Sequence, residues 1–279
     1  QFDLIAGIGQ SLAGRVGRVE LLPLAQSEMR QAGCLPDTLD QLLLNGGYPA
    51  VYSRQLAPAD WYGNYVSTYL ERDVRQLLEI KDLALFQRFL KLCAARTGQL
   101  LNLSALGADC GITGVTARQW MSVLEASYLV TLVQPYHRNF GKRLVKTPKL
   151  YFLDTGLAAW LLGIRDVATM ALHPQRGALF ETWVVAEQVK QAFNLGETPG
   201  ISFWRDHAGH EVDLIREDAL RVYPTEIKSG ATFATDWANA LQKLKALAGQ
   251  GVADPRIVYG GDASFKRDGY HVVGWRDLG

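Results

Sequence analysis

Two carboxylates and a lysine interrupt strand-like segments in the last third of the sequence. Asp213 lies inside the apolar run 212–215, and Glu226 and Lys228 follow with a single residue between them. Side chains two residues apart share one face of a strand, so these charges converge if the two strands are neighbours. Carboxylate oxygens suit Mg²⁺, and an ammonium can orient or deprotonate an attacking water. We therefore predict metal-dependent phosphodiester hydrolysis, with Asp213 and Glu226 as metal ligands and Glu181 as an outer ligand.

A cluster of surface ion pairs is the alternative interpretation of the same residues. A glutamate and a lysine separated by one residue are expected about once in a chain of this length from average composition. The pattern becomes more specific because Asp213 precedes Glu226 by the length of a hairpin, and because a helical segment with Glu181 comes before both. An active metal site and an unused relative of one both stay open here.

The segments around these residues alternate between helical and strand patterns. We predict helices over 177–193 and 235–247, and strands over 201–205, 211–215, 220–228, 256–259 and 271–273. Such an order is typical of an α/β layer domain.

The middle of the sequence has the pattern of a winged helix. Helical periodicity covers 86–95, a short segment that begins near Ser104, and 113–126. Ser104 and Thr113 are the expected N-caps, and Gly111 suits the tight turn between the second and third helices. Strands are predicted over 128–135 and 149–153, with a basic turn between them.

Duplex DNA is the partner that this middle unit suggests. The third helix would face a groove and the basic wing would neutralise phosphates. The alternative is that the unit packs neighbouring domains and that its wing is only a solvated hairpin. The candidate contact residues are Arg118, Gln119, Arg138, Lys142, Arg143 and Lys146.

Composition limits the remaining classes. The 279 residues are 48% hydrophobic and 20% charged, which argues against disorder and coiled coil. Lys and Arg number 29 against 28 Asp and Glu, so net charge does not favour nucleic acid. Three scattered cysteines without paired spacing suit a reducing cytoplasm. No apolar run approaches the roughly 20 residues that span a bilayer, so we expect no membrane partner.

The sequence resembles prokaryotic AAA-type ATPases that carry a C-terminal domain of unknown function. The resemblance rests on the segments SLAGRV (11–16), GGYP (46–49), YLERDV (69–74) and KTPKLYFLDTGL (146–157). It continues through EVD (211–213) and EIK (226–228), which are similar to the PD-(D/E)XK restriction-endonuclease superfamily.

This resemblance implies ATP as a cofactor of the intact protein. The phosphate-binding loop of such ATPases lies upstream of the segment that begins this sequence, and the first residue is not methionine, so we expect a fragment without that loop. The resemblance makes Arg15 an arginine-finger candidate that reaches into a neighbouring subunit of a homo-oligomer. A helix-ending arginine that complements the helix dipole is the plainer alternative.

From these patterns and the resemblance, we predict a mixed α/β fold with four regions. We expect the end of an ATPase module over 1–28, with a strand at 16–22, and a helical linker region over 29–84. A winged-helix domain follows over 85–170, and a nuclease-like α/β domain over 171–279. Three functions remain: the C-terminal portion of an ATPase acting on or near DNA, a Mg²⁺-dependent endonuclease, and a non-catalytic DNA-binding or docking adaptor.

Overall fold

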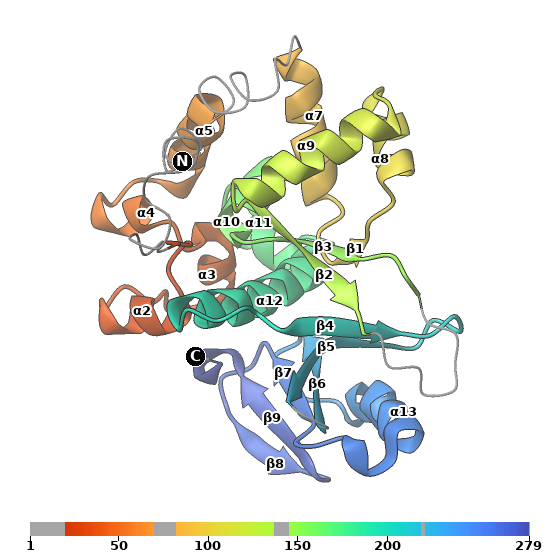
Figure 1. Ribbon diagram of the computed structural model, residues 1–279. Helices are drawn as coiled ribbons and strands as arrows, with labels where there is room; N and C mark the ends of the chain where they lie inside the picture. The colour runs from red at the N-terminus through yellow and green to blue at the C-terminus, as the bar shows by residue number, and fades with distance from the viewer. Residues whose placement is uncertain (1–19, 70–81, 137–144, 219–220, 279) are drawn as a thin grey trace, which may run out of the picture.

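The computed structural model describes residues 20–69, 82–136, 145–218 and 221–278 (Figure 1). Over these residues the fold is mixed α/β, with 48% helix, 20% strand and one nine-stranded mixed sheet, which confirms the expected fold class. Within the same ranges, no helix combines the length and the apolar character that crossing a bilayer requires.

The α-helices fall into an N-terminal group, a middle group and two helices of the C-terminal part. Their bounds are α2 (Gln26–Gln31), α3 (Leu39–Asn45), α4 (Pro49–Ser53), α5 (Pro58–Thr68), α7 (Leu83–Ala94), α8 (Leu103–Cys110), α9 (Gly114–Ala126), α10 (Thr155–Leu161), α11 (Val167–Leu172), α12 (Arg176–Asn194) and α13 (Asn239–Ala248).

The strands join one sheet in the order β1-β3-β2-β4-β5-β6-β7-β9-β8. Their bounds are β1 (Gln99–Leu100), β2 (Val130–Pro135), β3 (Lys149–Phe152), β4 (Ile201–Arg205), β5 (Glu211–Asp218), β6 (Arg221–Lys228), β7 (Arg256–Tyr259), β8 (Phe265–Arg267) and β9 (Tyr270–Gly274).

The middle unit has the helices and the hairpin that the sequence predicts. Thr113 caps α9 by accepting a hydrogen bond from the Thr116 amide, and Gly111 ends α8 at φ +83°, a left-handed conformation that glycine adopts at little cost. Ser104 is not the cap of α8. The N-cap is Asn102, two residues before Ser104, because the Asn102 side chain accepts a hydrogen bond from the Ala105 amide.

One parallel pair of strands joins the middle unit to the C-terminal sheet. β2 runs parallel to β4, with Gln134 opposite Ser202 and Pro135 opposite Phe203. The small sheet of the wing (β1, β3 and β2) therefore continues into the sheet of the C-terminal part, as Figure 1 shows.

Two helices cover opposite faces of the C-terminal sheet. α12 contacts β3 of the wing and β6, so one helix spans both parts of the sheet. On the other face, Leu241 and Leu244 of α13 pack against Val212 and Ile215 of β5. The result is the helix–sheet–helix layering that the alternating pattern predicts.

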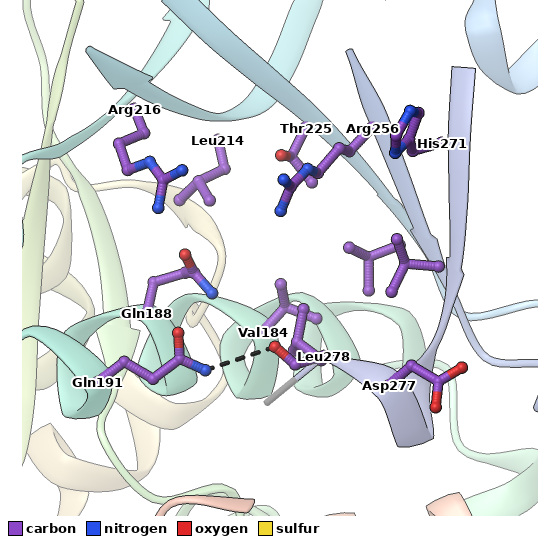
Figure 2. Close-up of a pocket in the computed structure, with 12 residues that line it drawn as sticks. Val184, Gln188, Gln191, Leu214, Arg216, Thr225, Arg256, His271, Asp277 and Leu278 are labelled. Atoms are coloured by element: carbon purple, nitrogen blue, oxygen red, sulfur yellow. Dashed lines mark hydrogen bonds between the residues drawn. The ribbon is translucent and has the colours of Figure 1, made fainter. Parts of the chain in front are cut away.

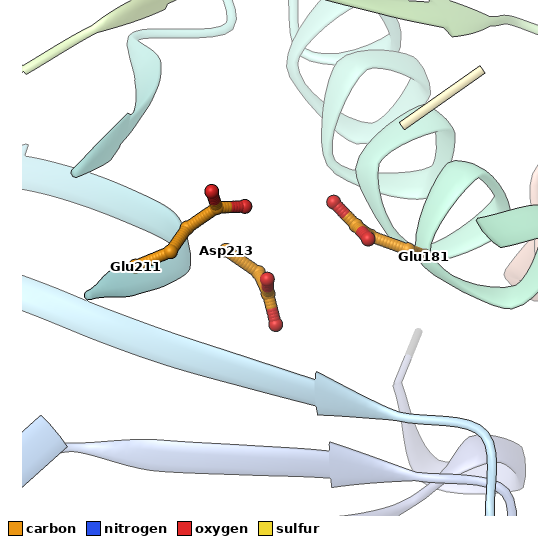
Figure 3. Close-up of side chains that lie close together, drawn as sticks. All are labelled: Glu181, Glu211 and Asp213. Carbon is orange, nitrogen blue, oxygen red and sulfur yellow. The ribbon is translucent and has the colours of Figure 1, made fainter. Parts of the chain in front are cut away.

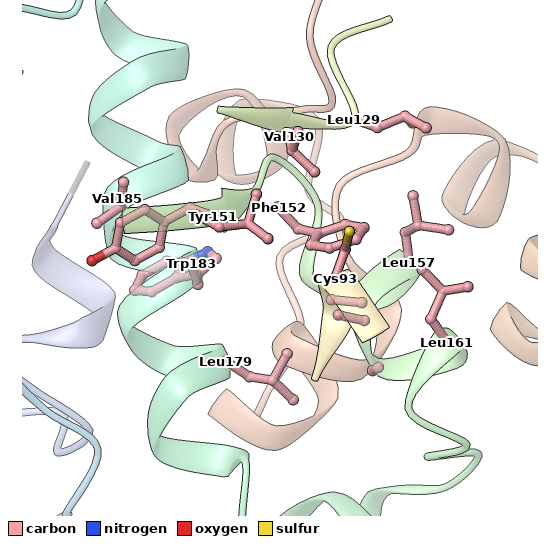
Figure 4. Packing of buried hydrophobic residues seen from close by; sticks show 14 of the residues in the cluster. Cys93, Leu129, Val130, Tyr151, Phe152, Leu157, Leu161, Leu179, Trp183 and Val185 are labelled. Carbon is pink, nitrogen blue, oxygen red and sulfur yellow. The ribbon is translucent and has the colours of Figure 1, made fainter. Parts of the chain in front are cut away.

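The main hydrophobic core contains residues from the N-terminal helices, the middle unit and the C-terminal sheet. It runs from Met29 near the beginning to Trp275 near the end. In its centre, Tyr151 and Phe152 of β3 lie between α12 and α10 (Figure 4). Because β3 is buried on both faces, it reads as a continuous apolar run apart from Lys149.

The N-terminal helices are tied to this core through Asp154. Its carboxylate caps α10 at the Leu157 amide and accepts from the Gly47 amide at 2.6 Å and the Tyr62 hydroxyl at 2.7 Å.

The strand expected over 16–22 is wrong for the residues that the structure describes, because residues 20–22 form no strand. Residues 16–19 lie outside the described ranges.

Candidate functional site

A β-bulge places Asp213. Ile215 pairs with Ser202 and Val212 pairs with Trp204, so two residues of β5 stand opposite one residue of β4. Bulges of this kind redirect side chains and are common beside active sites. Val212 and Ile215 pack under α13, whereas Leu214 packs into the core on the α12 side.

The Asp213 carboxylate fills the gap where β5 and β6 separate. The regular pairing of these antiparallel strands ends at Leu214 opposite Thr225. Beyond that point, Oδ2 of Asp213 accepts a hydrogen bond from the Ile227 amide at 2.7 Å. The side chain thus anchors β6 at the residue between Glu226 and Lys228.

Three carboxylates from two elements gather at this point. Glu181 projects from α12 toward Glu211 and Asp213 of β5 (Figure 3). One oxygen of each lies within 4.8 Å of the others, a spacing that suits a shared cation. We call these three residues the carboxylate triad.

A lysine from the wing inserts among the triad. Lys149 of β3 is only 2% exposed, and its Nζ donates to Oε1 of Glu181 at 2.9 Å and contacts Oε1 of Glu211. The Tyr151 hydroxyl donates to the same Glu181 oxygen at 2.6 Å. Arg205 donates to the other Glu211 oxygen at 2.9 Å. The structure therefore neutralises the triad with its own cations.

Glu226 and Lys228 form a separate pair beside the triad. The Lys228 ammonium donates to Oε1 of Glu226 at 2.5 Å, and its side chain is 35% exposed. Glu226 is 5% exposed, and its Oε2 has no hydrogen-bond partner among the described residues. A buried carboxylate oxygen without a hydrogen-bond donor destabilises the folded state, and a bound cation would remove that penalty.

Burial and mutual repulsion shape the titration of these groups. Burial raises the pKa of Asp213 well above its ordinary value, and the nearby Glu181 and Glu226 charges raise it further. Burial also raises the pKa of Glu226, although Lys228 opposes the shift. Burial lowers the pKa of Lys228, but the Asp213 and Glu226 charges more than offset it. Such shifts concentrate at functional sites.

The structure regroups the residues that the sequence predicted. Glu181, expected as an outer ligand, lies with Asp213 in the triad, whereas Glu226 is outside it. Sequence reasoning did not select Glu211 or Lys149. Glu211 could have been found by its place two residues before Asp213 on one strand. Lys149 could have been found as a charge inside an otherwise apolar strand.

The DNA-contact candidates are only partly described. Arg118 and Gln119 are exposed on α9, and Lys146 is exposed just before β3. The other four nucleotide- or DNA-related candidates lie outside the described residues: Arg15, Arg138, Lys142 and Arg143.

A polar pocket lies farther along α12, apart from the triad. It has a volume of about 310 Å³ and is lined by Gln188 and Gln191 of α12, by Arg216 of β5, and by Arg256 and His271 on neighbouring strands (Figure 2). The Asp254 carboxylate lies 2.9 Å from the Arg256 guanidinium and 3.2 Å from the His271 ring. None of the predicted site residues that the structure describes is among those that line the pocket.

Two segments of the chain match known domain families. Residues 36–168 match the domain of unknown function DUF8612, and residues 176–278 match the domain of unknown function DUF4143. Lys149 belongs to the first segment, and the triad belongs to the second.

Two mycobacterial proteins are similar to nearly the whole chain. They are Uncharacterized protein Rv2008c of Mycobacterium tuberculosis and Uncharacterized protein Mb2031c of Mycobacterium bovis. Each is 33% identical over 267 residues, which cover 94% of this chain and 57% of the relative. The chain thus spans little more than half the length of these relatives.

Proposed function

We propose that this chain is the effector part of an AAA-type ATP-binding protein and that its C-terminal domain is a metal-dependent DNA nuclease. The match over residues 176–278 supports the first half, because DUF4143 is found in ATPase-associated AAA-like proteins. Under this proposal ATP binds to a part of the protein outside these 279 residues. Arg15 then serves a neighbouring subunit of a homo-oligomer.

The unpartnered Oε2 of Glu226 carries the nuclease proposal. This oxygen is buried, and the Glu226 charge raises the pKa of Asp213, so two interacting carboxylates include one buried acceptor without a hydrogen bond among the described residues. Hard oxygen donors in this number fit Mg²⁺ or Mn²⁺. Asp213 and Glu226 would hold the metal, with Glu181 as a further ligand. A bound metal supplies charge stabilisation at the phosphoryl oxygen and an acidified water.

The remaining chemistry belongs to residues of the chain. Asp213 keeps β6 in place through the Ile227 amide, so Glu226 and Lys228 are presented at a fixed position on the strand. The Lys228 ammonium is held by Glu226 yet is partly exposed, so it can contact a phosphate or orient a water at the site entrance.

Cleavage of supercoiled plasmid DNA tests this proposal. We expect the 279-residue chain to nick the plasmid with Mn²⁺ or Mg²⁺ and not with EDTA. Asp213→Asn, Glu226→Gln and Lys228→Met should each lower the rate by about 100-fold or more, the usual effect of losing a catalytic group. Lys245→Met, which changes an exposed lysine of α13, is the matched control.

Two results would contradict the proposal. Cleavage that persists unchanged in all three site variants would come from another site or from a contaminant. A chain that folds and never nicks DNA with either metal would leave the non-catalytic adaptor as the better account of this domain.

A further inference from the structure

We infer that the Lys149 ammonium is a built-in cation that competes with a divalent metal for Glu181, Glu211 and Asp213, so the site loads metal only when Lys149 leaves. This inference rests on the proposed function, because Asp213 and Glu181 belong both to the proposed metal site and to the triad that Lys149 contacts. It also makes the site composite. The wing provides the competing cation, and the C-terminal domain provides the carboxylates.

The contacts of Lys149 are those of a cation in a built binding position. Its Nζ contacts Glu181 and Glu211, and Asp213 adds to the negative field around it. The Phe203 ring, at 5.5 Å from Nζ, and the neighbouring Tyr151 ring complete the surroundings. Lys149 is more deeply buried than any of the three carboxylates that it faces.

An ammonium and a divalent metal compete for the same small cluster of carboxylates. Lys149 Nζ already contacts one oxygen of Glu181 and one oxygen of Glu211. Mg²⁺ binds oxygen at about 2.1 Å, so a metal held by these carboxylates would stand within a few ångströms of the ammonium. Their repulsion would be large in a site with little water. Metal binding therefore requires the Lys149 side chain to move.

The triad needs a neighbouring cation both in the metal-free and in the metal-bound protein. Three carboxylates with oxygens within 4.8 Å repel one another strongly, and their partial burial limits the water that would screen them. If Lys149 is removed, the negative charge that it neutralised remains. We expect this charge to be met by a metal, which means that loss of Lys149 raises metal affinity while it lowers the stability of the metal-free protein.

Mn²⁺ titration of the 279-residue chain tests this competition. Free Mn²⁺ is measured by electron paramagnetic resonance for the wild type, Lys149→Met, and the control Lys245→Met, which changes an exposed lysine of α13. We expect Lys149→Met to bind Mn²⁺ at least tenfold more tightly than the wild type, and Lys245→Met to match the wild type. Equal affinity in all three would overturn the inference.

A charge-balanced pair of variants covers the case in which Lys149→Met does not fold. Glu211→Gln removes one carboxylate, and Lys149→Met combined with Glu211→Gln removes an ion pair without changing net charge. We expect the double variant to bind Mn²⁺ at least tenfold more tightly than Glu211→Gln alone. We also expect Mn²⁺ to raise its melting temperature more. If the two variants have the same Mn²⁺ affinity and the same Mn²⁺-induced shift in melting temperature, competition between Lys149 and the metal is rejected.

The metal titration separates this inference from the proposed function. A gain in Mn²⁺ affinity without DNA cleavage by any variant keeps Lys149 as a competing cation and removes the nuclease. DNA cleavage that depends on Asp213, with no gain of affinity in either Lys149 variant, keeps the nuclease and removes the competition.

Discussion

Asp213 combines a structural task with a chemical one. Its bulge turns the side chain away from the regular pairing of β5, and its carboxylate then takes the Ile227 amide that the separating strands leave without a ladder partner. A neutral hydrogen-bond acceptor would perform the structural task equally well. The negative charge is therefore a cost in the metal-free fold, which is the usual condition of a residue retained for binding or catalysis.

This cost predicts how stability depends on pH. Burial, Glu181 and Glu226 hold the pKa of Asp213 above its unfolded value, so the folded state binds this proton more tightly. The stabilisation that this proton gives is complete below the unfolded pKa near 4 and is lost as pH rises through the folded pKa. Asp213→Asn cannot lose a proton, and its amide oxygen can still accept from Ile227. Relative to the wild type, we expect Asp213→Asn to become more stable as pH rises from 4.5 to 8.

Urea unfolding in EDTA at several pH values measures this difference. Asp218→Asn, at the exposed end of the same strand, is the control and should track the wild type throughout. A stability difference between Asp213→Asn and the wild type that stays flat, or that shrinks as pH rises, would show that the Asp213 charge carries no such cost.

At the scale of elements, Asp154 shows how one helix cap can hold several segments. Its carboxylate accepts from the Leu157 amide of α10, from the Gly47 amide and from the Tyr62 hydroxyl of α5. The residue is 3% exposed. Replacing it leaves the Leu157 and Gly47 amides without an acceptor in a region that water does not reach, whereas the Tyr62 hydroxyl can still donate to the Asn45 carbonyl at 2.9 Å. Each unpaired buried donor costs about 1 to 3 kcal/mol.

We therefore expect Asp154→Ala to lower the free energy of unfolding by about 3 kcal/mol or more. Asp166 caps α11 in the same way, through the Thr169 amide, but it is exposed. Asp166→Ala should cost only about 1 kcal/mol, the usual value for an N-cap. Chemical denaturation of both variants measures the contrast, and equal losses would mean that burial does not decide the strength of these caps.

Local patterns predict the elements better than the contacts between them. The helices of the middle unit and the strands that hold Asp213 and Glu226 follow from periodicity and turn residues, which act over a few positions. The bulge at Asp213 depends on the pairing of β5 with β4, and periodicity along one strand does not reveal it. Lys149 reaches the triad only because the wing and the C-terminal sheet are joined, and such a long-range arrangement has no local signal in the sequence.

At the scale of the molecule, the two matched segments form one structural unit. β2 pairs with β4, and the Tyr136 amide donates to the Phe203 carbonyl at 2.7 Å where the two meet. α12 contacts β3, α3 and α10 in addition to β6, so its apolar face is buried by both segments. Separation would expose that face to water, at roughly 25 cal/mol for each Å² of apolar surface.

This shared core predicts a single unfolding transition for the chain. We expect tryptophan fluorescence and far-UV circular dichroism to follow one coincident urea transition, because a core that runs from Met29 to Trp275 cannot be lost in one half alone.

Residues 171–278 produced by themselves should bind a hydrophobic dye and unfold without cooperativity, because the apolar face of α12 would be exposed to water. Two well-separated transitions in the whole chain, or a fragment that unfolds cooperatively, would instead mean that the segments are independent domains in mere contact. In that case Lys149 could leave the triad by separation of the domains, and the metal affinity of the isolated fragment should equal that of Lys149→Met.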